Sequence, residues 1–89
     1  MAYLAEYTDT YGGEWPNYGW VRRVYVESAE SAKAALRKAR AEIGLTGVRG
    51  RIVADFGDEI HWMPTGCCTV LMVRWDDTPP EHRYAAPII

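Results

Sequence analysis

Histidine, cysteine and acidic side chains in the second half of the chain are the residues whose types could support chemistry. Two groups have suggestive spacing: the potential metal ligands His61, Cys67, Cys68 and His82, and the potential acid–base or cation-binding residues Asp55, Asp58, Glu59 and His61. Structural zinc sites usually take their ligands in closely spaced pairs, and adjacent cysteines on a strand point to opposite faces. Acidic residues beside a glycine are also ordinary in hairpin turns. We therefore predict no metal site and no cofactor, and keep a small metal-dependent enzyme as an alternative.

Other catalytic arrangements find no support in the chain. The only serines, Ser28 and Ser31, fall together at the start of a predicted helix, and the only lysines, Lys33 and Lys38, fall within it. A nucleophilic triad needs a serine or cysteine held beside a histidine, and a phosphate loop needs glycines immediately before a helix. The residues before this helix are rich in valine instead. The sequence therefore predicts a protein that is not an enzyme.

Charge is distributed unevenly along the 89 residues. Residues 22–51 carry eight basic and three acidic side chains, whereas both ends of the chain are acidic and the net charge is −2. The acidic ends either neutralise the basic middle internally or leave it free to bind a partner. The sequence does not decide between the two.

The basic middle predicts two clusters that could bind a partner. On the helical wheel one flank carries Lys33, Arg37 and Arg40, and the face of the sheet away from the helix carries Arg23, Arg49, Arg51 and Tyr25. Arginine and aromatic residues on a sheet face bind single-stranded nucleic acid in some proteins, through phosphate contacts and stacking. A pI near 5.6 is low for such a domain and favours a solvated charged face. Nucleic-acid binding is therefore an alternative function.

Aromatic residues near the N-terminus are candidate anchors for a protein partner. Trp15 and Tyr18 lie in a segment rich in glycine and proline that connects two predicted strands. Large aromatic side chains bury much area at low entropic cost, which makes them frequent hot spots of interfaces. The alternative is that they fold down onto a small core. Both interpretations remain open.

One helix and five strands are predicted, in the order ββαβββ. The strands are expected at residues 1–7, 19–27, 48–56, 59–63 and 67–75, and the helix at 28–44. The third strand should direct Val48, Ile52, Ala54 and Phe56 to one face, and the very apolar fifth strand should be central. This pattern predicts an α+β fold in which a single helix packs on a mostly antiparallel five-stranded sheet.

The helix has the clearest pattern in the chain. An apolar stripe of helical periodicity runs along it, consisting of Ala29, Ala32, Leu36, Ala39 and Ile43. We expect Ser28 to be the N-cap, Gly44 to end the helix with positive φ, and Ala34 to face outward. The small alanines indicate that the sheet beneath lies close.

Length and composition predict the domain organisation and the cellular location of the protein. A chain of this length, with 48% hydrophobic residues, predicts one domain at 1–78, followed by an extended tail at 79–89 whose prolines prevent a further element. It has no long apolar run and no predicted signal peptide, and its two cysteines do not form a disulfide framework, so we expect a cytoplasmic protein without membrane contact.

The short chain, the Ala-rich helix on a sheet and the missing catalytic residues resemble small phage or mobile-element accessory proteins, anti-CRISPR proteins among them. Many of these act by occupying a surface of a host protein. We therefore expect a non-enzymatic module that binds a protein partner with an acidic surface and inhibits or modulates a larger complex. A homodimer is also compatible with the sequence.

Overall fold

The structure is a computed structural model and describes residues 1–10 and 21–83. In chain order its elements are β1 (Tyr3–Asp9), β2 (Arg22–Val26), α1 (Ala32–Ile43), β3 (Gly50–Asp55), β4 (Glu59–Pro64), β5 (Thr69–Trp75) and the short 3-10 helix η2 (Pro80–His82). The predicted α+β class and the order ββαβββ are confirmed. The predicted strands differ from these bounds by up to a few residues at their ends.

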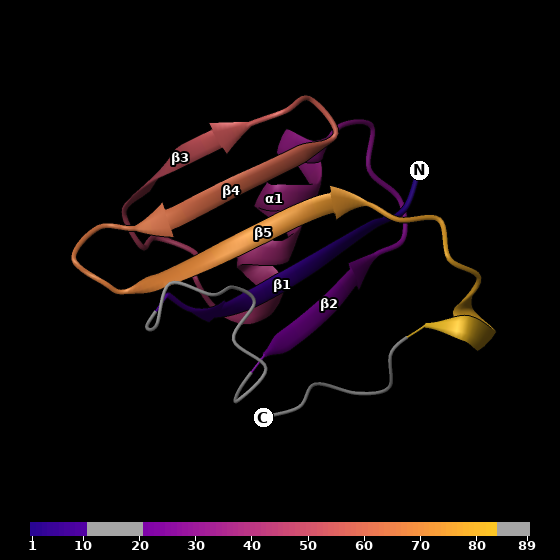
Figure 1. The fold of residues 1–89 in the computed structure, drawn as a ribbon, viewed down its shortest axis with the longest axis horizontal. Helices are drawn as coiled ribbons and strands as arrows, with labels where there is room; N and C mark the ends of the chain where they lie inside the picture. Colours follow the sequence, from indigo (N-terminus) through magenta and orange to yellow (C-terminus); the bar gives the residue numbers. More distant parts are fainter. Residues whose placement is uncertain (11–20, 84–89) are drawn as a thin grey trace.

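All five strands form one antiparallel sheet in the order β2-β1-β5-β4-β3. β5 is the middle strand, as its apolar sequence predicts, and four consecutive residues from Val70 to Val73 are buried. Figure 1 shows β2 and β3 at the two edges, with α1 behind the sheet. One face of the sheet therefore carries the only α-helix of the described residues.

The core lies between α1 and the sheet. The predicted stripe of the helix is buried in full, and it packs against helix-facing residues of the sheet such as Tyr3, Trp62 and Leu71. Along α1 the alanines allow a close approach, because their side chains end at Cβ. α1 contacts β2, β1, β5 and β4, but it makes no contact with β3.

Two details of the helix differ from the sequence prediction. Ser31, not Ser28, is the N-cap: its backbone is extended, and its hydroxyl accepts a hydrogen bond of 3.1 Å from the N–H of Ala34. Ala34 is buried instead of facing outward, because the buried surface of α1 is wider than a single stripe. Gly44 ends the helix with φ of 93°, as expected, and its N–H donates to the carbonyl groups of Ala41 and Arg40.

The β2 side of the sheet is tied to several distant segments. Arg22 donates from its guanidinium to the carbonyl of Ile43 at the end of α1, at 3.3 Å. The chain after β5 returns along this side: the N–H of Asp76 donates to the carbonyl of Ala2, and Arg83 stacks on Tyr25 with 4.5 Å between guanidinium and ring centre. The domain boundary at residue 78 stays a prediction.

A β-bulge interrupts β3. Ile52 lies opposite Trp62 of β4, whereas Ala54 lies opposite His61, so Val53 is an extra residue. Since neighbouring residues of β4 point to opposite faces, Ile52 and Ala54 do too. The prediction that Ile52 and Ala54 share one face is therefore wrong, because a simple alternation cannot represent the inserted residue.

Candidate functional site

β3 is the least covered element of the sheet. None of its six residues is buried, and no described element lies beyond it in Figure 1. Ile52 and Val53 are 41% and 39% exposed, and Phe56, immediately after the strand, is 67% exposed. These are three of the five exposed large hydrophobic residues in the described part of the chain. The β3 edge (residues 49–56) is therefore an exposed, partly apolar surface on an edge strand whose outer side is open among the described elements.

The turn after β3 holds Phe56 outward. A carboxylate oxygen of Asp55 accepts the N–H of Gly57 at 3.0 Å, and the N–H of Phe56 donates to the carbonyl of Glu59 at 2.8 Å. Gly57 has φ of 89°, a conformation that favours glycine. Phe56 touches the His61 ring edge-on, with ring centres 5.9 Å apart, on the face away from α1. Two thirds of its surface still faces solvent.

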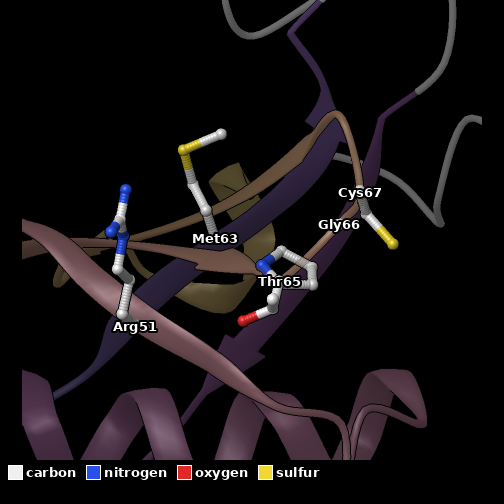
Figure 2. A pocket seen from close by; sticks show the side chains of 6 residues that line it. Arg51, Met63, Thr65, Gly66 and Cys67 are labelled. Carbon is white, nitrogen blue, oxygen red and sulfur yellow. The ribbon is translucent and has the colours of Figure 1, made fainter.

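Arg49 and Arg51 add positive charge at the other end of the same edge, and both are exposed. Arg51 lines a pocket of about 330 Å³ together with Met63, Pro64, Thr65, Gly66 and Cys67. Figure 2 shows Arg51 and Met63 pointing away from α1, while the thiol of Cys67 points away from both. Because the side chains of Arg51 and Cys67 do not point to one place in the pocket, they form no catalytic arrangement there.

Arg23, a predicted binding residue, lies in a buried ion pair. The register places it opposite Glu6, and its Nε donates to one oxygen of that carboxylate at 3.0 Å. Arg74 donates to the other oxygen at 2.8 Å, and the side chains of Arg23 and Glu6 are 6% and 1% exposed. Burial lowers the pKa of Arg74, but the hydrogen bond and charge of Glu6 outweigh it and raise that pKa overall. The single carboxylate thus accepts a hydrogen bond from each of two guanidinium groups.

The predicted basic clusters are not continuous patches. Arg23 lies on β2 and Arg51 on β3, at opposite edges of the sheet. On the helix, Lys33 and Arg37 are exposed, but Arg40 is half-buried. The guanidinium of Arg40 donates to the carbonyl groups of Leu45 and Val48 and lies 4.4 Å from the centre of the Trp62 ring. Arg40 therefore fixes the connection between α1 and β3.

The groups proposed for metal binding or acid–base chemistry remain dispersed. His61 contacts Glu59, with 2.7 Å between Nε2 and Oε2, but no set of three or more histidine, cysteine or acidic residues gathers within residues 1–10 and 21–83. Cys67 and Cys68 are exposed free thiols, and His82 lies in η2. Trp15 and Tyr18 lie outside the described residues, so their role as anchors stays a prediction.

Comparison with family models, with curated proteins and with solved structures gave no match. Within the described residues, no helix has the length and apolar character needed to cross a bilayer. The site must therefore be interpreted from its own geometry.

Sequence reasoning missed Ile52, Val53 and Phe56 as surface residues. It assigned Ile52 and Phe56 to an apolar face, which would ordinarily be covered by the helix. A signal was present, because two arginines immediately precede this apolar segment and the pair Gly57-Asp58 after it indicates a turn. The sequence pattern does not show how many strands of the sheet the helix covers.

Proposed function

We propose that this chain is a non-enzymatic, cytoplasmic protein-binding module that acts by occupying a surface of a larger complex, as an inhibitor or modulator. The observation that supports this proposal is the β3 edge, where Ile52, Val53 and Phe56 are exposed along a strand and its following turn, and where the strand pairs with β4 on one side but has no neighbour among the described elements on the other. Exposed apolar clusters commonly mark interaction sites.

The open side of an edge strand offers backbone groups as well as side chains. Its outward N–H and C=O groups can hydrogen-bond to an added strand, while alternate side chains give specificity. The exposed arginines beside the apolar centre set the orientation and rate of approach of a charged partner. Lys33 and Arg37 on α1 remain candidates for the same steering role toward an acidic surface, because both are exposed.

The nucleic-acid alternative has less support. It needs Arg23, Arg49 and Arg51 on one continuous face, whereas Arg23 is buried against Glu6 and lies at the sheet edge opposite Arg51. Phosphate contacts require accessible cations that release counterions on binding. An affinity that changes little when salt is added favours the protein-binding function over nucleic-acid binding.

The test is affinity capture with the tagged chain from cells that express it, comparing wild type with Phe56→Asp. A matched control is Trp75→Asp, because Trp75 is also a half-exposed aromatic residue but lies on β5. Circular dichroism first establishes that both variants are folded. We expect a specific protein to be retained by wild type and Trp75→Asp and lost with Phe56→Asp. Equal capture by all three chains, or loss with the control only, contradicts the proposal.

A further inference from the structure

The β3 edge is complementary to a second copy of itself. Its basic residues, Arg49 and Arg51, lie at the start of the edge, and its acidic residues, Asp55 and Asp58, lie at the end. When two such strands run antiparallel, the basic half of each lies beside the acidic half of the other. The resulting attraction acts between the oppositely charged ends of the two strands and not within one cross-strand pair, because Arg51 and Asp55 point to opposite faces of the sheet.

The bulge limits which registers are compatible with a continuous sheet. Arg51 shares a face with Met63 and Ala54 shares a face with His61, and both faces point away from α1. Gly50 and Asp55 both point to the α1 side, opposite Pro64 and Ile60. Arg51 opposite Asp55 would join residues from different faces. Gly50 opposite Asp55, with Arg51 opposite Ala54, matches the faces at both ends.

The backbone supports the same register. Arg49 and Phe56 direct backbone groups toward the β4 side: the carbonyl of Arg49 accepts from Thr65, just after β4, and the N–H of Phe56 donates to Glu59. Because backbone groups alternate sides along an antiparallel strand, Gly50 and Asp55 direct theirs to the open edge. The matched faces and the outward backbone groups therefore select the same pairing of Gly50 with Asp55.

This register also covers the exposed apolar residues. Ile52 and Val53 of one copy lie opposite Val53 and Ile52 of the other, at the centre of the contact. Three pairs further out, Phe56 lies opposite Arg49, with Arg51 as its diagonal neighbour. A guanidinium group near an aromatic face is attracted to it, so two arginines of one copy can hold the phenylalanine of the other.

We infer that the partner of the β3 edge is a second copy of this chain, joined by a two-fold axis between the two β3 strands into one ten-stranded sheet. This inference rests on the proposed function, because the second copy occupies the same surface when the larger complex is absent. The two-fold axis uses each contact twice and closes the assembly at a dimer. A contact of one strand from each side is small, so the dimer should dissociate on dilution.

The experiment is sedimentation velocity of the purified full chain over a concentration series. We expect the mass to rise from the 10.1 kDa monomer to twice that value. Phe56→Asp should remain monomeric at every concentration, while charge reversal on the helix, Lys33→Glu with Arg37→Glu, should dimerise like wild type. Circular dichroism of each variant verifies that it is folded.

Exchange of charges tests whether the two strands run antiparallel, because it changes the net charge at each end of the contact. Arg49→Glu with Arg51→Glu should be monomeric, as should Asp55→Arg with Asp58→Arg, because each places like charges beside one another. An equimolar mixture of the two should form a heterodimer, since both halves of its contact are again complementary. A mixture that stays monomeric, or wild type that is monomeric throughout, overturns the inference. If a monomeric wild-type chain still captures another protein through Phe56, the proposed function stands and only this inference fails.

Discussion

The two edges of the sheet differ in how the fold uses them. At the β2 edge, Arg22 binds the end of α1, Arg23 pairs with Glu6, and Arg83 stacks on Tyr25. At the β3 edge none of the six strand residues is buried. One helix of 12 residues, about 18 Å long, covers four strands and leaves the fifth open. In a domain this small, a binding surface reduces the stability of the fold least when it lies on the uncovered strand.

Removing the buried carboxylate should have the largest effect on stability. Glu6→Ala removes the shared partner of the buried Arg23 and the partly exposed Arg74, and we expect a loss of about 3 kcal/mol in the free energy of unfolding, most of it from Arg23. The matched change at the other edge, Asp55→Ala, should cost about 1 kcal/mol or less, because Asp55 is exposed and loses only its hydrogen bond to Gly57. Urea denaturation of dilute protein measures both. Equal losses would remove the distinction between the edges.

The next effect compares apolar residues of the two edge strands. Val26→Lys introduces a charge beneath α1 and should cost about 2 kcal/mol or more. Ile52→Lys should change stability by under about 0.5 kcal/mol, because lysine is well tolerated on an exposed edge strand. Thermal denaturation at low protein concentration measures the loss of stability in each variant. A large loss for Ile52→Lys would mean that β3 is part of the core.

Gly50 is the one position of β3 whose substitution should destabilise the fold. A Cβ atom there would lie 2.2 Å from the ring of Trp62, which is buried. Gly50→Ala should therefore displace that ring and cost about 1–2 kcal/mol. Val53→Ala is the control, with a much smaller expected loss. A structure of Gly50→Ala with an unmoved Trp62 would refute this explanation.

The smallest expected effect depends on pH. Hydrogen bonding from Thr78 lowers the pKa of Asp76, against the opposing effect of burial, and the charges of Arg74 and Arg83 lower it further. A lowered pKa stabilises the fold above the ordinary value of about 4 and ceases to do so as pH falls through the folded-state value. Asp76→Asn should therefore cost under about 0.5 kcal/mol at pH 7. The difference from wild type should vanish below that folded-state value; a difference that grows in acid contradicts this assignment.

Much of the fold follows from local patterns. The stripe from Ala29 to Ile43 predicts the helix and its buried face, and the apolar residues 70–73 predict the central strand. The N-cap was misplaced by three residues, because Ser28 and Ser31 are equally good local candidates and tertiary packing decides between them. The bulge at Val53 was not predictable, because no residue type in β3 marks it.

The candidate site was harder to predict, because exposure depends on contacts between distant segments. Arg23 and Arg40 look like solvated cations in the sequence. The partner of Arg23 is Glu6, on another strand, and Arg40 stacks on Trp62 of β4. Conversely, Ile52 looks like a core residue and is exposed because α1 ends short of β3. Trp15 and Tyr18 remain sequence predictions.

The central claim, that the β3 edge pairs with a second copy while the β2 edge is structural, can be tested in one titration. Amide chemical shifts of the wild-type chain are followed by two-dimensional NMR during dilution. We predict concentration-dependent shifts at residues 49–56 and constant shifts at Arg22–Val26. Changes that cluster on β2 or on α1, or a spectrum that is the same at all concentrations, would contradict the claim.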